Sequence, residues 1–391
     1  MSIPLQEIQE AIRGEGLDGW LFCNFHHRDT LSDSILGIKP DSTNSRLWVY
    51  AVPVSGEPLG IVHAIEQHEL DALPGSKISY ISRSDLTFAL KPLEGKSWGA
   101  HFSANLTAIS LLDAGTASFF TGAGLRLVSA EGLIQRFKAL LSPEEIESHE
   151  RASAHLHEIV KAIWPVVNRF FIEDKALYEG DLRGEITAMM DERGLITDHP
   201  PIVGAGINSG NPHYDFEKRG ALIRRGEVIQ FDLWAKEKTE GSIYADISWV
   251  GVFSEKAGIA VEKAFADLIE AREGAISFIE NSLASGKLPT GASVDRKTRE
   301  ILIAKGYEKA LRHRTGHGID TECHGSGVNI DSLEFPDERL LLDGSCFSLE
   351  PGIYFPDFGL RTEIDVTIRG GKAVVSGGAY PRQTVLLLCG E

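Results

Sequence analysis

Two aspartates stand inside apolar runs near the middle of the chain, and they limit the possible folds more than any other feature. Asp232 lies in Val-Ile-Gln-Phe-Asp-Leu-Trp, and Asp246 lies in Ile-Tyr-Ala-Asp-Ile-Ser-Trp. A carboxylate is costly to bury in such a run unless it has a partner. The polar segment 236–242, which contains Gly241, joins the two runs, so we expect an antiparallel hairpin.

The symmetry of this hairpin predicts how the two aspartates lie. If the hairpin is symmetric about Thr239, Asp232 and Asp246 are direct cross-strand neighbours, roughly 5 Å apart at Cβ. Two carboxylates at that distance repel each other, and a divalent cation between them is the usual resolution. A hairpin with one buried and one exposed acid would show the same pattern, so the pair alone leaves both interpretations open.

Further candidate ligands follow in the last part of the chain. His317 lies between two glycines, which would let its backbone approach a ligand closely, and imidazole is a common metal ligand. Glu350 ends an apolar run just before a Pro-Gly turn. Arg361, Glu363 and Asp365 alternate with apolar residues at period two and therefore share one strand face, although an ordinary amphipathic strand would show the same pattern.

These residues form an oxygen-rich set with a single imidazole, which suits Mn²⁺, Co²⁺ or Fe²⁺ and allows Zn²⁺. The candidate metal ligands are Asp232, Asp246, His317, Glu350 and Glu363. Their four carboxylates would be neutralised by two divalent cations. No cysteine joins the set, which argues against a structural zinc site.

At these positions the chain resembles the M24 metallopeptidases, the pita-bread family of methionine aminopeptidase, aminopeptidase P, prolidase and creatinase. The family's ligand order, Asp, Asp, His, Glu, Glu, is matched, as are the contexts Gly-His317-Gly-Ile and Glu350-Pro-Gly-Ile-Tyr. The resemblance implies two divalent metal ions, Mn²⁺ or Co²⁺ above the others. It also implies an Xaa-Pro aminopeptidase or Xaa-Pro dipeptidase that acts on a peptide substrate, commonly as a homodimer.

The same resemblance assigns roles around the metal ligands. His213, in Ser-Gly-Asn-Pro-His-Tyr, and His324 are similar to the two histidines that contact the scissile carbonyl in the family. Both are therefore candidate catalytic and substrate-binding residues. Glu350 is the candidate for handling the proton of the nucleophile, and Arg361 is the candidate substrate-site residue that orients a carboxylate ligand.

Several departures from the family pattern leave other reactions open. The segment between Asp232 and Asp246 is longer than usual, Trp249 stands where many relatives have an arginine, and Gly325 replaces the acid that commonly follows the second histidine. The segment 325–329 contains no arginine to hold the carboxylate of a dipeptide. The alternatives are a non-peptidase reaction at the same metal site (another C–N hydrolase or a lyase), a metal-free hydrolase, and a non-catalytic binding protein.

The length of 391 residues predicts two domains, 1–141 and 142–391. Strand-like runs at 20–23 and 47–52, with a helical stretch at 64–73 between later strands, predict a mixed α/β domain first, similar to the creatinase-type N-terminal domain. Four of its residues are candidates for limiting substrate length over the site: Trp20, Phe25, His26 and His27. The last two are adjacent and would face opposite ways on a strand.

The second domain should begin at Ser142, which with Pro143 and Glu145 forms a capping-box pattern. Helices are expected from there through Val167 and at 181–193, 255–283 and 294–305. Strands are expected at 228–235, 243–253, 346–354 and 360–368. Two helix pairs interleaved with antiparallel hairpins predict an α+β fold, the pita-bread catalytic domain of the resemblance.

Charge and cysteine usage exclude some classes of partner. The net charge of −17 disfavours binding to nucleic acid. The longest apolar runs are too short to span a bilayer, so we expect no membrane association. Widely spaced cysteines and an N-terminus without a signal-peptide pattern favour a cytoplasmic protein. The cysteines are Cys23, Cys323, Cys346 and Cys389.

Overall fold

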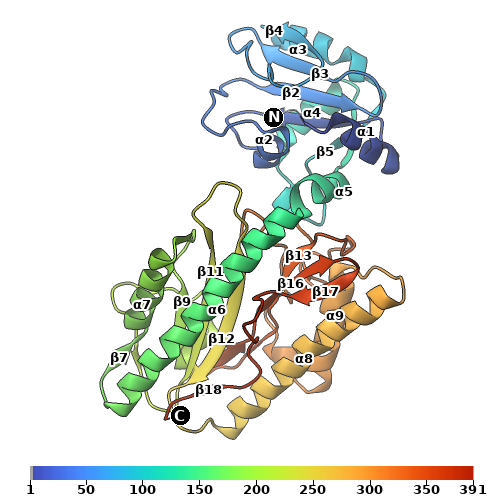
Figure 1. Cartoon of the computed structure of the whole chain (residues 1–391). Helices are drawn as coiled ribbons and strands as arrows, with labels where there is room; N and C mark the ends of the chain where they lie inside the picture. Colours follow the sequence, from blue (N-terminus) through green and yellow to red (C-terminus); the bar gives the residue numbers. More distant parts are fainter. Residues whose placement is uncertain (1–2, 391) are drawn as a thin grey trace. The chain divides into compact units, whose positions relative to one another are not determined.

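The computed structural model describes residues 3–390, which divide into two compact units, one ending at Lys138 and the other beginning at Ala139 (Figure 1). This division falls close to the expected boundary between Leu141 and Ser142. The first unit is a mixed α/β structure, and the second combines antiparallel strands with two pairs of long helices. Both fold types agree with the sequence prediction.

The first unit is built on a six-stranded mixed sheet with the strand order β4-β3-β2-β1-β5-β6. Its central strand β1 runs antiparallel to β2 and parallel to β5. The strands are β1 Gly19–Asn24, β2 Trp48–Pro53, β3 Leu59–His63, β4 Ser76–Tyr80, β5 Ser97–Ala100 and β6 Arg126–Ser129. The helices are α1 Leu5–Gly14, α2 Thr30–Leu36, α3 Arg83–Ala89, α4 Ala114–Gly122 and α5 Glu131–Ile134.

Both faces of this sheet are covered, because every residue of β1 is buried. Trp20 and Phe22 pack in one hydrophobic cluster with residues of α1, and Leu21 and Cys23 pack in another with residues of α3. Successive side chains of a strand point to opposite faces, which explains this separation. Trp20 is 0% exposed and donates a hydrogen bond to His101, so it belongs to the core and is not the substrate contact that we expected.

One local expectation for the first unit is wrong. Residues 64–73 form a series of turns in place of a helix, and Leu70 has a positive φ of 65°, which interrupts helical geometry. His26 and His27 do not lie on a strand, because β1 ends at Asn24 and both histidines have positive φ in the turn that follows. The ring of His27 bonds to Asp33.

The second unit begins with the helix α6, Pro143–Ile172, and the predicted capping box is present at its start. The Glu145 N–H donates to the Ser142 hydroxyl, and the Ser142 N–H donates to the Glu145 carboxylate. The buried residues of α6 pack against two long antiparallel strands, β11 Val228–Glu237 and β12 Ala245–Val252. These two strands carry the candidate aspartates.

The helices of the second unit flank its strands on two sides. Figure 1 shows α6 and α7 on one side of β11 and β12 and α8 and α9 on the other. The remaining helices are α7 Glu179–Glu192, α8 Ile259–Ala284 and α9 Gly291–Ala304. The remaining strands are β7 Leu177–Tyr178, β8 Leu195–Ile196, β9 Ile202–Ala205, β10 Leu222–Ile223, β13 Cys346–Leu349, β14 Gly352–Tyr354, β15 Gly359–Arg361, β16 Ile364–Arg369, β17 Lys372–Val375 and β18 Leu387–Leu388.

The register of the β11–β12 hairpin differs from the prediction by two residues. Asp232 lies opposite Ser248, and Asp246 lies opposite Trp234. Pairing ends at Ala245, because the Tyr244 N–H donates to the carbonyl of Asp320 and not to β11. A shift of two positions keeps each side chain on its original face, so the two aspartates still face the same side as diagonal neighbours.

The two later strand predictions are each interrupted at a glutamate. The run 346–354 is two strands, β13 and β14, separated by Glu350 and Pro351. The run 359–369 is likewise divided into β15 and β16, with Thr362 and Glu363 between them. Pro351 has no N–H to continue a ladder. β14 pairs with β15, whereas β13 and β16 belong to a three-stranded sheet with β17, so both glutamates lie where the chain passes between sheets.

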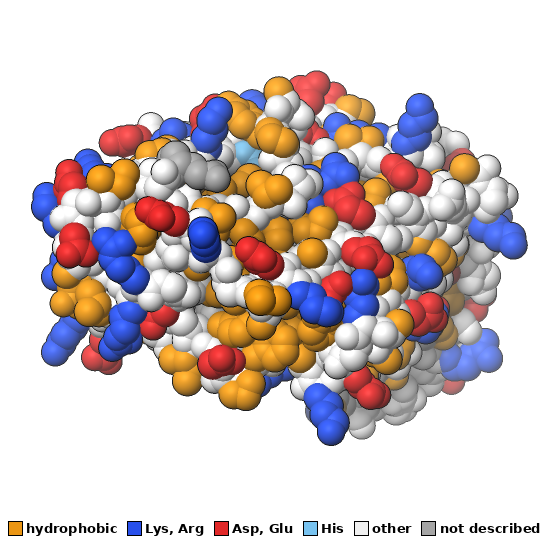
Figure 2. Space-filling view, turned by 90° about the horizontal axis from the view of Figure 1, so that it is seen from below, with side chains coloured by type: hydrophobic (Ala, Val, Ile, Leu, Met, Phe, Trp, Pro, Cys, Tyr) orange, Lys and Arg blue, Asp and Glu red, His pale blue; other side chains and the backbone are white. Residues whose placement is uncertain are grey.

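On the face drawn in Figure 2, acidic and basic side chains are interspersed, and hydrophobic side chains gather in one group among them. This face shows no broad area of a single charge sign. No helix within residues 3–390 is both long enough and apolar enough to cross a bilayer.

Candidate metal centre

All five predicted metal ligands line one cavity of about 500 Å³ in the second unit. Neighbouring strands supply the aspartates, and the two strand interruptions described above supply the glutamates. The histidine comes from the long segment between α9 and β13. The residues are Asp232 on β11, Asp246 on β12, His317, Glu350 and Glu363.

The ligand atoms form two groups that share one glutamate. Atoms of Asp232, Asp246 and Glu363 lie within 4.8 Å of one another, as do atoms of His317, Glu350 and Glu363. The Nε2 atom of His317 is 3.6 Å from Asp246 Oδ2 and 3.6 Å from Glu350 Oε1. The arrangement therefore offers two adjacent places for cations, with Glu363 common to both.

Unsatisfied charge in this cluster is what a divalent cation would neutralise. Asp246 is buried, and its Oδ1 atom has no hydrogen-bond partner among the described residues. Burial and the neighbouring Asp232 raise the pKa of Asp246 well above its usual value. Burial and then Asp246 do the same to the pKa of Glu363. Carboxylates in this state take up protons unless cations are bound, so the donor set fits divalent metal ions.

Arg361 is directed at a candidate ligand. Its guanidinium bonds to the carboxylate of Asp232, and its Nε donates to the Ser248 hydroxyl at 3.1 Å. The same hydroxyl is 3.0 Å from Asp232 Oδ1 and 2.8 Å from Glu363 Oε2. Arg361 is 4% exposed. These contacts favour a role in holding Asp232 over the direct substrate contact that the sequence also allowed.

Glu350 differs electrostatically from the other carboxylates of the cluster. Burial alone would raise the pKa of Glu350, but the charges of His313 and His317, together with those of Arg361 and Arg314, outweigh burial, and the pKa is lowered. Burial lowers the pKa of His317, so its imidazole is neutral near neutral pH. The His317 Nδ1 faces the Gly318 carbonyl at 3.4 Å, which leaves Nε2 free to bind a cation. Glu350 is thus an ionised carboxylate able to accept a proton.

The glycines beside His317 have a different purpose from the one expected. A Cβ on Gly316 would lie 2.0 Å from the Ser348 carbonyl oxygen, and a Cβ on Gly318 would lie 2.4 Å from the backbone of Gly327. Neither glycine has a positive φ. They therefore permit close backbone packing against β13 and the 327 segment, which fixes the position of the His317 ring, and they do not bring backbone to a ligand.

The two candidate substrate histidines both line the cavity wall. The ring of His324 lies 4.2 Å from that of His317, measured between centroids. The neighbouring His317, together with burial, lowers the pKa of His324 to about 4. His213 is exposed and follows β9. Asp198, His199 and other residues between β8 and β10 complete the wall.

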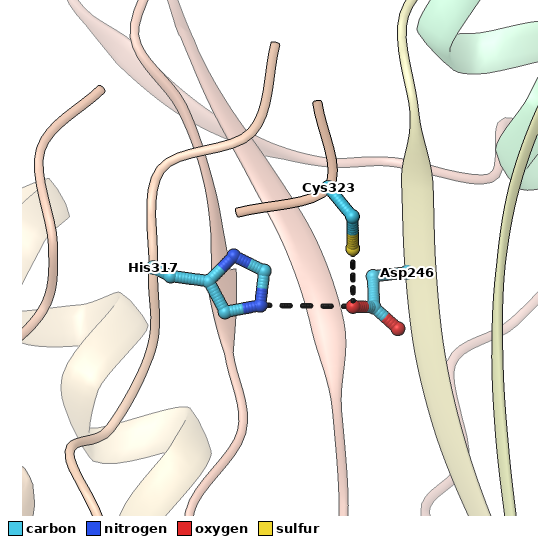
Figure 3. Close-up of side chains that lie close together, drawn as sticks. All are labelled: Asp246, His317 and Cys323. Carbon is cyan, nitrogen blue, oxygen red and sulfur yellow. Dashed lines mark hydrogen bonds and ion pairs between the residues drawn. The ribbon is translucent and has the colours of Figure 1, made fainter. Parts of the chain in front are cut away.

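The structure adds one residue that the sequence interpretation missed. The thiol of Cys323 donates to Asp246 Oδ2 at 3.1 Å, and Cys323, Asp246 and His317 form a third group of possible metal ligands (Figure 3). A cysteine therefore lies beside the predicted ligand set, which the sequence interpretation had left without one. Asp365 accepts a hydrogen bond from the Asp246 backbone N–H at 2.8 Å. The only sequence signal for Cys323 was its place next to His324.

The chain is similar in sequence to known proteins. The profile of metallopeptidase family M24 matches residues 146–370. An Xaa-Pro dipeptidase of Lactobacillus helveticus is 28% identical over 233 residues, which are 59% of this chain and 57% of that protein. The chain spans 65% of the length of the first curated relatives that it matches.

Solved structures resemble nearly the whole chain, but their sequence identity to it is low. This likeness therefore shows the fold alone. The dipeptidase PepE from Mycobacterium ulcerans gives a TM-score of 0.74 at 20% identity, and the alignment covers 98% of this chain and 96% of that one. The X-Pro aminopeptidase from Thermotoga maritima gives a TM-score of 0.62 at 20% identity, covering 99% of this chain and 100% of that one.

Proposed function

The chain belongs to metallopeptidase family M24, and on this basis we propose that it uses two divalent metal ions to remove the N-terminal residue from peptides with proline in the second position. The observation that carries the proposal is the pair of ligand groups that share Glu363 inside one cavity. Bound divalent cations supply Lewis-acid polarisation of a carbonyl and activation of water at neutral pH. The protein's own residues must supply the ligands, the base and the substrate contacts.

Asp246 is better placed than Asp232 to be the second ligand shared by both metal positions. Its Oδ2 atom lies 3.6 Å from the Nε2 atom of His317, and it also belongs to the group with Glu363. Asp232 is tied to Arg361 and Ser248 on the other side. We therefore assign Asp232 to one metal position and Asp246 to both.

Glu350 is the candidate base, because its lowered pKa keeps it ionised at neutral pH. It would accept a proton from the attacking water and return it to the leaving amine. His213 and His324 would donate N–H groups to the scissile carbonyl and to the oxygen that becomes negative during attack. The low pKa of His324 means that it would donate as a neutral imidazole.

The charges around the cavity favour an aminopeptidase over a strict dipeptidase. Among the described residues that line it, Arg361 is the only arginine or lysine, and Arg361 bonds to Asp232. The C-terminal carboxylate of a dipeptide lies one residue from the scissile bond and would need a nearby cation. Asp198 and Asp215 on the wall suit the free amino group that both kinds of substrate carry, so the missing cation alone separates them.

A cytoplasmic site of action is part of the same proposal. The four cysteines are free thiols, and all four are buried. Unpaired cysteines are typical of proteins kept in a reducing compartment. Fractionation of the producing cells, followed by detection of the protein with an antibody, would test this location.

One experiment tests the activity. The purified protein is stripped of metal and reloaded separately with Mn²⁺, Co²⁺ or Zn²⁺. Each form is then assayed on Xaa-Pro dipeptides, on longer Xaa-Pro peptides and on matched Xaa-Ala peptides. We expect metal-dependent release of the first residue from the longer Xaa-Pro peptides. Two bound metals without peptide cleavage would point to another reaction, and His317→Ala with full activity and normal metal content would end the proposed scheme.

A further inference from the structure

Cys323 is a buried cysteine next to the candidate metal centre. It lies in the segment after His317, is 4% exposed, and packs among Ile243, Tyr244 and Ile319 beneath the cluster. Its Sγ atom is 3.1 Å from Asp246 Oδ2. Figure 3 shows His317 and Cys323 approaching the same oxygen of Asp246 from two different segments.

The spacing of these three side chains would allow one metal ion to bind all of them. The Oδ2 of Asp246 is 3.1 Å from the sulfur of Cys323 and 3.6 Å from Nε2 of His317, and all three atoms lie within 4.8 Å of one another. A tetrahedron built with ordinary zinc–sulfur, zinc–nitrogen and zinc–oxygen bonds has edges of roughly 3.3–3.6 Å. The observed distances are therefore close to those that one cation would impose.

A second observation points to a cation bound by the Asp246 carboxylate. Asp246 is 5% exposed, yet its Oδ1 atom has no hydrogen-bond partner among residues 3–390. A thiol that only filled space beside a carboxylate would satisfy one oxygen and leave the carboxylate's charge unneutralised. Thiol sulfur is a weak hydrogen-bond donor, so this contact alone does little to offset the burial of Asp246.

We propose that Cys323 is a sulfur ligand to the metal ion held by Asp246 and His317, and that it gives this position a preference for thiophilic divalent ions. The inference rests on the proposed function, since it assigns a further ligand to the same metal centre. On binding, the thiol proton leaves to solvent and the thiolate sulfur forms a bond to the cation. Sulfur donors favour Zn²⁺ and Cd²⁺, whereas oxygen donors suit Mn²⁺.

The test measures the ligands directly, without an activity assay. The full chain is loaded with Zn²⁺, and X-ray absorption determines whether a sulfur scatterer lies at about 2.3 Å from zinc, beside nitrogen and oxygen scatterers at about 2.0–2.2 Å. The same measurement is made on Cys323→Val and Cys323→Ser. The matched control is Cys346→Ala, which removes an equally buried cysteine of the same hydrophobic cluster. Circular dichroism checks that each variant folds.

We expect the sulfur scatterer near zinc in the wild type and in Cys346→Ala, and we expect its loss in both Cys323 variants. We also expect the Cd²⁺-over-Mn²⁺ affinity ratio to fall about 10- to 100-fold in Cys323→Val, the range typical for losing a group that supports a metal site. A wild-type protein that binds metal with nitrogen and oxygen scatterers only would overturn the sulfur ligand and leave the proposed peptidase intact. Failure of the wild type to bind any metal would overturn both.

Discussion

Arg361 bonds to the carboxylate of Asp232 inside the wall of the cavity, and the same guanidinium reaches the hydroxyls of Ser248 and Tyr354. A planar guanidinium fixes a carboxylate through several donors at once, which a lysine ammonium cannot reproduce. Arg361→Lys keeps the positive charge but loses this fixed geometry. We therefore expect its affinity for divalent metal to fall about 10- to 100-fold, measured by titration calorimetry on metal-free protein.

The control for this variant is Arg296→Lys. Arg296 forms an exposed ion pair with Glu338, where the two side chains are 50% and 60% exposed, so its replacement should leave metal affinity unchanged. If Arg361→Lys bound metal as tightly as the wild type and instead weakened substrate binding, Arg361 would be a substrate contact after all.

Removal of metal should make stability depend on pH in a predictable direction. Burial and neighbouring acids raise the pKa values of Asp246, Glu363 and Asp365 well above their usual values in the folded protein. A raised pKa means that the folded state binds more protons than the unfolded state at pH above the ordinary carboxyl pKa. The stability from these protons is complete below that value and is lost as pH rises through the folded pKa.

Metal-free protein should therefore lose thermal stability as pH rises above about 6.5, the ordinary pKa of histidine. Below that pH the lowered pKa values of His317 and His324 act in the opposite sense, as does the lowered pKa of Glu350 below its own ordinary value. Melting temperatures with chelator and with excess metal at each pH provide the measurement. The variant Asp246→Asn should flatten the metal-free dependence. A metal-free protein that became more stable toward pH 8 would contradict the prediction.

The sequence predicted those features that depend on residues close together in the chain. The capping box at Ser142 and Glu145 identified the start of α6, because its hydrogen bonds connect residues three positions apart. The side-chain period of a strand likewise predicted that Asp232 and Asp246 face the same side. A register shift of two residues preserves that face, so this conclusion survived an error in the pairing.

Contacts between distant segments decided what the sequence could not predict. The hairpin register depends on the bond from Tyr244 to Asp320. The position of Cys323 depends on how the segment after His317 folds back on β12, and no period or spacing within the sequence reveals that contact. The strand interruptions at Glu350 and Glu363 depend on which sheet each strand joins. Only the first interruption had a local signal, because Pro351 lacks the N–H that a continuing strand would need.

The capping box also gives a stability prediction for the second unit. Ser142→Ala removes the hydroxyl that accepts the Glu145 N–H at the start of α6. We expect the free energy of unfolding of this unit to fall by about 1 kcal/mol, within a range of about 0.5–2 kcal/mol. Urea unfolding at saturating metal, followed by tryptophan fluorescence, measures the change.

Ser277→Ala is the matched control, because Ser277 is exposed within α8 and alanine has the higher helix propensity. It should leave stability unchanged or raise it slightly. Equal losses in the two variants would mean that the effect of Ser142→Ala is not one of capping.

His324 tests whether the histidines beside the metal ligands contact substrate or only support the metal. Its ring packs 4.2 Å from that of His317, so either role fits its position. As a donor to the developing negative oxygen, it should matter in the transition state. We expect His324→Ala to lower kcat by about 10²- to 10³-fold with a normal metal content. His199→Ala, which alters the same cavity wall, should have a much smaller effect on kcat.

The pH profile separates the two roles further. Because the pKa of His324 is lowered to about 4, the ring is neutral throughout the range from pH 5 to pH 9 and gives no titration there. The acid limb of kcat/KM should therefore keep the same midpoint in His324→Gln, while the rate falls at every pH. A loss of bound metal in His324→Ala that matched its loss of activity would instead assign His324 to the support of His317, and the oxygen contact would then have to come from His213 alone.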